Sequence, residues 1–200
     1  MGILTMGLAE SKLTVVGAGF WIRVLARLID TCVSGAIGLF TGLVAGITLV
    51  ILQSSSIIEP GWLHRIQGIH LETLAASLMG VAFYHTLCEG IHGATLGKLI
   101  CGLSVLKEDH LTPCGLKAAV IRSFAYFVDA FFFGLVAYLS MEKTALQQRH
   151  GDHWGGTVVV KKSQVPAESR RSGLRFLGAF ALGSTAYGVL LLAATVWIAL

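Results

Sequence analysis

The octapeptide Arg23-Val-Leu-Ala-Arg-Leu-Ile-Asp30 opens the first long apolar segment of the chain, and Arg122-Ser-Phe-Ala-Tyr-Phe-Val-Asp129 opens the third. Both stretches begin with Arg, carry Ala at the fourth place and end with Asp. On an α-helix, residues seven apart lie about two turns apart on one face. A carboxylate at membrane depth is costly unless it is neutralised, paired or hydrated. We therefore expect these intramembrane charges to fix a helix arrangement or to handle an ion.

The composition is that of a membrane protein. Of the 200 residues, 54% are hydrophobic and 13% are charged, against about 25% charged residues in a soluble domain. Four apolar stretches, roughly 24–52, 69–91, 118–141 and 174–200, are each long enough to cross about 30 Å of hydrocarbon as a helix. The sequence predicts an all-α polytopic membrane helix bundle with three or four hydrophobic helices and an interfacial Gly-rich loop over 93–107.

Basic residues gather in two connections, before and after the third apolar segment. If all four segments cross and the N-terminus is inside, the second basic connection lies outside, which the positive-inside rule opposes. We therefore expect the third segment to dip in and return, with a break between Asp129 and Gly134, so that both basic connections and the N-terminus face the cytoplasm. Anionic lipid headgroups are the expected contacts of the most basic stretch, which contains Lys161, Lys162, Arg170 and Arg171.

Two sets of residues recur at helical spacing. Small residues every four positions in the first segment predict a face on which another helix can approach closely: Ser34, Gly38, Gly42 and Gly46. In the second segment, His85, Glu89 and His92 share a face. Such a set can form a proton path or bind zinc or iron, but we expect a polar stripe facing the bundle, with no bound metal and no cofactor.

The repeated octapeptide leaves two pairings open. Arg23 can hold Asp30 on its own helix as a structural pair. Alternatively, two facing helices can exchange partners, with Arg23 pairing with Asp129 and Arg122 with Asp30. Breaking a buried ion pair costs roughly 3–5 kcal/mol, so either pairing would fix the helix register.

Four pieces of sequence share their order with one known family: Gly19-Phe20-x-x-Arg23-x-x-Ala26-x-x-Ile29-Asp30, Gly93-x-Thr95-x-Gly97-Lys98, Arg122, and Asp152-x-x-Gly155-Gly156-Thr157-Val158-Val159-Val160. Together they resemble the RDD family of membrane proteins over about 19–161. By position, the resemblance identifies the family's arginine as Arg23, its first aspartate as Asp30 and its second as Asp152, with Asp129 as the competing assignment. The other motif positions are Gly97, Lys98, Gly156 and Thr157.

This resemblance implies a multi-helix membrane domain. Some members are similar to sodium/proton antiporters and others to scaffolds inside larger membrane complexes. The fourth segment lies beyond the resemblance. We therefore divide the chain into an N-terminal cytoplasmic segment (1–18), a membrane domain (19–162), a basic linker (163–173) and an additional transmembrane helix (174–200).

No arrangement of nucleophile, base and acid suits catalysis, so we expect no enzyme, and the placement of Lys and Arg in connections indicates no nucleic-acid partner. The sequence favours an accessory or scaffold subunit that packs against other membrane proteins or forms a homo-oligomer, in a bacterial inner membrane. The alternative is a small cation/proton antiporter of the Na⁺/H⁺ type, acting as a homo-oligomer. The shallow depth of Asp30 and Asp129 favours the first interpretation, because transporters build their sites near the midplane.

Overall fold

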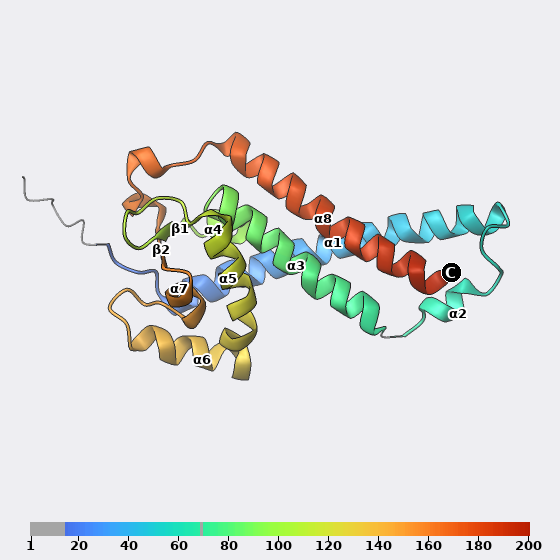
Figure 1. Cartoon of the computed structure of the whole chain (residues 1–200), viewed down its shortest axis with the longest axis horizontal. Coiled ribbons are helices and arrows are strands. Elements are labelled where there is room, and N and C mark those ends of the chain that lie inside the picture. Colours follow the sequence, from blue (N-terminus) through green and yellow to red (C-terminus); the bar gives the residue numbers. More distant parts are fainter. Residues whose placement is uncertain (1–14, 69) are drawn as a thin grey trace, which may run out of the picture.

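Three long helices dominate the computed structural model, which describes residues 15–68 and 70–200 (Figure 1). They are α1 (Phe20–Ser54), α3 (Leu71–Ile91) and α8 (Gly173–Ala199), and each is long and apolar enough to cross a membrane. The expected all-α membrane bundle is therefore confirmed. The N-terminal segment expected to be cytoplasmic, 1–18, lies mostly outside the described residues.

A bent pair of helices takes the place of the predicted third segment. α5 (Gly115–Asp129) is followed by α6 (Phe131–Glu142), and the chain turns by 109° between them. The break falls where the sequence predicted it, at Phe132 and Gly134, whose φ angles are 49° and 87°. Counted as one bent span, the pair would be a fourth crossing. In Figure 1 both helices lie at the end of the molecule that holds the short elements.

A two-stranded sheet joins the two basic connections. β1 (Leu103–Lys107) pairs antiparallel with β2 (Thr157–Lys161), so that the first residue of β1 lies opposite the last residue of β2. β1 lies in the stretch expected as an interfacial loop. The apolar side chains of the two strands are buried, on one face against α1 and α5 and on the other against turn residues. Paired strands cannot lie on opposite sides of a bilayer, so both basic connections occupy one end of the bundle.

The remaining short elements lie at the two ends of the molecule. The end that contains the sheet, called the polar end below, also contains α4 (Leu96–Ile100), α7 (His150–Trp154) and the 3₁₀ turns η1 (Lys162–Gln164) and η2 (Ala167–Ser169). α2 (Trp62–Ile66) lies at the opposite end, beside the end of α8.

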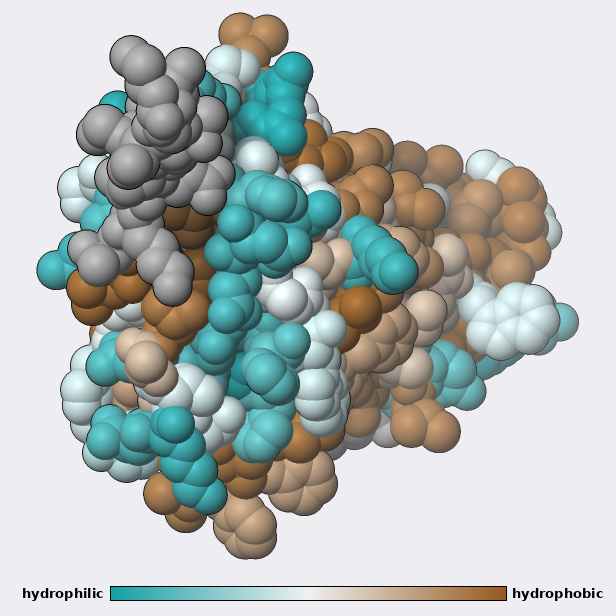
Figure 2. Space-filling view, turned by 60° about the vertical axis from the view of Figure 1, so that its left-hand side comes forward, coloured by the Kyte–Doolittle hydropathy of each residue, from teal (hydrophilic) through white to brown (hydrophobic). Residues whose placement is uncertain are grey.

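Charge is distributed unevenly between these ends. Arg65 of α2 donates hydrogen bonds to the carbonyl oxygens of Ala199 and Leu200 at 3.0 and 2.8 Å. Every other Lys and Arg within the described residues lies in the short elements and connections of the polar end, in α5, or in the first turns of α1 and α8. Figure 2 shows hydrophilic side chains gathered over this end and hydrophobic ones along the long helices behind it.

The predicted glycine face of α1 packs only in part. Ser34 is buried, and a Cβ at Gly38 would lie 3.8 Å from the Tyr187 hydroxyl of α8. Gly42 and Gly46 face open space, with nothing within 4 Å of the point that a Cβ would occupy. The buried face of α1 turns away from these two glycines, because a strict four-residue repeat drifts around a helix of 3.6 residues per turn. The buried face continues through three other residues: Thr41, Ala45 and Leu49.

Candidate functional site

A fully buried aspartate joins three arginines at the polar end. Arg23 Nη1 donates to Asp152 Oδ2 at 2.5 Å, and Arg149 Nε lies 3.2 Å from Asp152 Oδ1. Arg122 Nη1 also donates to Asp152 Oδ1. The four residues come from α1, α5 and the start of α7, so one carboxylate links elements that are far apart in the sequence.

The local fold of α7 explains why Asp152 stands at this point. Arg149 is the N-cap residue of this one-turn helix, and its backbone N–H donates to Asp152 Oδ2 at 3.3 Å. A carboxylate three residues after an N-cap satisfies an N–H group that the helix leaves free. The turn thus helps to orient the carboxylate toward the arginines.

Neighbouring positive charges affect the pKa of Asp152 more strongly than burial does. Burial by itself would raise the pKa of the Asp152 carboxyl, but the guanidinium groups of Arg122, Arg149 and Arg23 hold that pKa well below its usual range. The carboxylate is therefore ionised and forms charge-assisted hydrogen bonds, which are the stronger kind.

Arg122 bridges this aspartate to a second carboxylate, Glu89 of α3. Its Nε donates to Glu89 Oε2 at 3.0 Å, and its Nη1 donates to Thr157 Oγ1 at 2.7 Å. Lys98 of α4 donates to Glu89 Oε1. Burial lowers the pKa of the Lys98 ammonium, and Glu89 opposes that shift. Four elements, α3, α4, α5 and β2, are thus tied through one arginine and one glutamate.

Asp30 is held by uncharged donors. Thr95 Oγ1 donates to Oδ2 at 2.6 Å, the Gly97 N–H donates to Oδ1 at 2.8 Å, and the Tyr84 hydroxyl lies 3.3 Å from Oδ1. A Cβ at Gly97 would collide with the Ala26 carbonyl oxygen, so glycine is required for this approach of α4 to α1. Two members of the predicted motif, Asp30 and Gly97, therefore contact each other directly.

Asp129 takes a different set of partners. It accepts from the Gly151 N–H at 3.2 Å, and Arg149 Nε lies 3.6 Å from its Oδ2. His150 Nδ1 lies 3.4 Å from its Oδ1. Asp129 thus fixes the start of α7 against the end of α5.

Both predicted pairings of the octapeptides were wrong. Arg23 contacts neither Asp30 nor Asp129, and Arg122 does not contact Asp30. The physical reason is that α4 and α7 stand between the helices and supply their own donors and acceptors. In the structure, Arg23 pairs with Asp152 instead, and the partners of Asp129 are Arg149 and His150.

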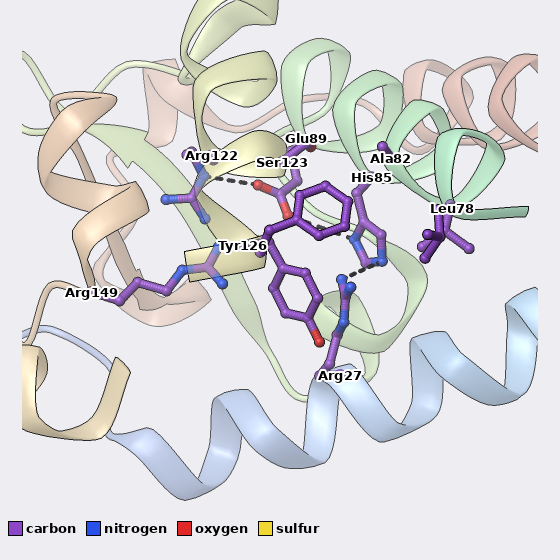
Figure 3. Close-up of a pocket in the computed structure, with 11 residues that line it drawn as sticks. Arg27, Leu78, Ala82, His85, Glu89, Arg122, Ser123, Tyr126 and Arg149 are labelled. Atoms are coloured by element: carbon purple, nitrogen blue, oxygen red, sulfur yellow. Dashed lines mark hydrogen bonds and ion pairs between the residues drawn. The ribbon is translucent and has the colours of Figure 1, made fainter. Parts of the chain in front are cut away.

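The residues considered for a proton path, His85, Glu89 and His92, do not form one group. Arg27 Nη1 lies 2.6 Å from His85 Nε2, and His85 Nδ1 lies 3.9 Å from Glu89 Oε1 (Figure 3). A guanidinium can only donate, so His85 accepts at Nε2 and is neutral, with its proton on Nδ1. His92 lies apart, with its ring 5.3 Å from that of Phe176 in α8. Across residues 15–68 and 70–200, no three His, Cys, Asp or Glu side chains are grouped to hold a metal ion.

A partly open cavity of about 390 Å³ lies between α1 and the bent pair, beside this network. Its lining includes Asp30, Glu89 and Asp129, together with Arg27 and Arg149. A smaller cavity of about 60 Å³ lies between α3 and α5, where the Arg27 guanidinium stacks 3.8 Å from the centre of the Tyr126 ring (Figure 3). The arrangement is able to hold a charged group at the edge of the apolar bundle.

Sequence reasoning missed several members of the network. It did not connect Lys98 with Glu89, and it gave no role to Arg149 or Tyr84. One signal was present: Arg149 stands three residues before Asp152, the spacing of an N-cap contact. The contact of Tyr84 with Asp30 had no such signal, because it joins separate helices.

The comparison with protein families gives one match. A family model described as the RDD family matches residues 17–200. The match includes α8, which we expected to be an addition to the family's domain. No curated protein and no solved structure gives a significant match. With three helices able to cross a membrane and a family match over almost its whole length, this chain belongs to the RDD family of membrane proteins.

Proposed function

We propose that this chain is an accessory or scaffold subunit of the membrane, which packs through its helices against other membrane proteins or a second copy of itself and has no catalytic activity. The observation that carries the proposal is that the buried carboxylates of the polar end all have partners within the chain. Each of the four carboxylates is held by cations or hydrogen-bond donors from other elements: Asp30, Glu89, Asp129 and Asp152. Such a network suits fixing an arrangement of helices rather than moving an ion through it.

The exposed side of α1 supports the packing role. Within its most apolar stretch, only 17% of the residues are buried, the smallest share among the three long helices. Gly35, Gly42 and Gly46 have nothing within 4 Å of a Cβ position, and they follow one side of the helix. Membrane helices associate by close backbone approach at small residues. This side of α1 is the surface on which we expect a partner helix.

Co-purification in a mild detergent tests the proposal. The tagged chain should bring down a stoichiometric membrane protein or a second copy of itself. Gly42→Leu should abolish that association, because the larger side chain blocks helix approach. Gly178→Leu is the matched control, since a Cβ at Gly178 of α8 also meets nothing within 4 Å. A solitary chain, or equal association of both variants, would contradict the proposal.

We also propose that the polar end faces the cytoplasm of a bacterial inner membrane, since the concentration of Lys and Arg at that end follows the positive-inside rule. Single cysteines placed at Leu63, Glu108 and Lys162, in a background without the four native cysteines, test this with an impermeant reagent on intact cells. Positions 108 and 162 should be protected and position 63 should react. Reaction of position 108 or 162 would refute this orientation.

The alternative function is a small cation/proton antiporter of the Na⁺/H⁺ type. The observation in its favour is the cavity of about 390 Å³, which three carboxylates line. Sodium-driven proton flux in proteoliposomes, lost in Asp129→Asn, would support it over the accessory role. Flux no greater than in empty vesicles would exclude it.

A further inference from the structure

We propose that the cavity between α1 and the α5–α6 pair binds one anionic phospholipid, with the phosphate of its headgroup among the arginines and its first acyl carbons along the apolar walls. This inference does not depend on the accessory role, because it concerns a ligand of the bundle itself. It is also distinct from the surface contacts expected at the basic connection after β2.

The charge of the cavity favours an anion. Five cationic side chains contribute to its lining: Arg23, Arg27, Lys98, Arg122 and Arg149. Three carboxylates line it as well, and a fourth, Asp152, lies directly behind Arg23 and Arg122. Five positive and four negative groups leave an excess of one positive charge. An uncompensated charge beside an apolar bundle is unfavourable, so a bound anion would stabilise this region.

The lining also offers a donor that no protein group uses. Among the described residues, Arg122 Nη2 is one of the buried side-chain atoms that have no hydrogen-bond partner. The whole Arg122 residue is only 1% exposed, so water does not satisfy this donor either. Buried donors in proteins are normally satisfied. Guanidinium groups bind phosphate oxygens through paired N–H donors. Arg122, Arg149 and Arg27 all line this cavity. Figure 3 shows the same three side chains around Tyr126, where they also line the smaller cavity between α3 and α5.

The apolar walls of the cavity favour a lipid over a free phosphate ion. One wall consists of apolar residues from the first turns of α1, Phe20, Val24 and Leu28. The opposite wall comes from the bent pair and includes Ala130, Ala137 and Met141. The cavity is lined by the first turns of α1 and by residues of the polar end, so lipid headgroups would lie at its level when the apolar part of α1 spans the bilayer. Its volume of about 390 Å³ falls within the range of about 300–1,000 Å³ that is usual for small-molecule sites.

Native mass spectrometry of the full chain tests this proposal. The detergent-purified protein is titrated with phosphatidylglycerol, with phosphatidylcholine of the same acyl chains, and with soluble sn-glycerol 3-phosphate. We expect one phosphatidylglycerol to be retained about tenfold more tightly than phosphatidylcholine, as expected from charge-assisted contacts with the arginines. The soluble headgroup should not displace it at equal concentration, because it lacks the apolar contacts.

Two variants and one control locate the site. Arg27→Gln should weaken retention of phosphatidylglycerol about tenfold, and it leaves the Asp152 network intact. Ala137→Phe should block the lipid by filling the cavity, without changing any charge. Arg65→Gln, at the opposite end of the bundle, should bind like the unmodified chain.

The outcomes separate clearly. Selective retention that both cavity variants weaken supports the proposal. Equal retention of the two lipids, or unchanged binding in Arg27→Gln and Ala137→Phe, overturns it. Displacement by glycerol phosphate at equal concentration assigns the cavity to a soluble phosphate and overturns the lipid assignment. Failure of the accessory role would leave all these results unaffected, because they require no protein partner.

Discussion

Replacing Asp152 by Asn removes the one anion that three arginines share, while it keeps the shape of the side chain. In the folded protein, Asp152 is 0% exposed and contacts Arg23, Arg122 and Arg149. The substitution leaves these guanidinium groups close together, with Glu89 as the remaining carboxylate partner of Arg122. The change therefore tests whether this contact holds α1, α5 and α7 together.

The expected destabilisation follows from burial. Removing one partner of a buried ion pair costs about 3–5 kcal/mol, and the burial of Asp152 excludes the solvent screening that weakens surface pairs. For a chain of this size, 1 kcal/mol shifts the melting temperature by about 2–4 °C. We therefore expect Asp152→Asn to melt about 6–20 °C below the unmodified protein.

Thermal melting in one detergent at one scan rate is the assay, with Glu59→Gln as the control. Glu59 lies 3.9 Å from Arg65, but its side chain is 88% exposed, so this control should melt within about 1–2 °C of the unmodified protein, as expected for a surface pair. Equal melting of Asp152→Asn and the unmodified protein would refute the view that this contact stabilises the fold.

The pH dependence gives a second check on the same residue. The folded-state pKa of Asp152 is depressed, so its stabilising contribution is present above the pKa of an unfolded aspartate, about 3.9. That contribution is lost as the pH falls toward the depressed pKa of the folded state. The stability difference between the unmodified protein and Asp152→Asn should be constant from about pH 5 to 8 and shrink below about pH 4. A difference that grows on acidification would contradict this assignment.

Two glycine substitutions test the close approaches between helices. Gly97→Ala should lower the melting temperature, with a cost of about 1–3 kcal/mol, because the new methyl group meets the Ala26 carbonyl oxygen. Gly80→Ala should destabilise the packing of α3 on α8 by a similar amount, since its methyl group meets the ring of Tyr187. Gly178→Ala, which meets nothing within 4 Å, should leave the melting temperature unchanged or slightly raised. Melting curves measured side by side check all three, and an equal loss in the control would show that steric contact is not the cause.

Much of the fold could be predicted because it depends on local patterns. The length of the apolar runs identifies the helices that can cross a membrane. The change of pattern between Asp129 and Gly134 located the break of the third segment. The distribution of Lys and Arg correctly grouped the two basic connections, and the order of short motifs led to the family.

The β-sheet was not predicted, because five-residue strands in a Gly-rich stretch carry little periodic signal and become stable only through pairing. The packing face of α1 was only partly predicted. Its register depends on where α8 lies, and the sequence spacing of Gly42 and Gly46 does not contain that information.

The charges show most clearly what the tertiary structure decides. The sequence by itself determined that Arg23, Asp30, Arg122 and Asp129 stand near the ends of apolar helices and require partners. Only the tertiary structure decided those partners, since Arg23 and Asp152 are separated by 129 positions. The spacing of residues along one helix fixes the face on which a charge lies. Which opposite charge meets it depends on how distant helices and turns pack, and that packing is set by the burial of the whole chain.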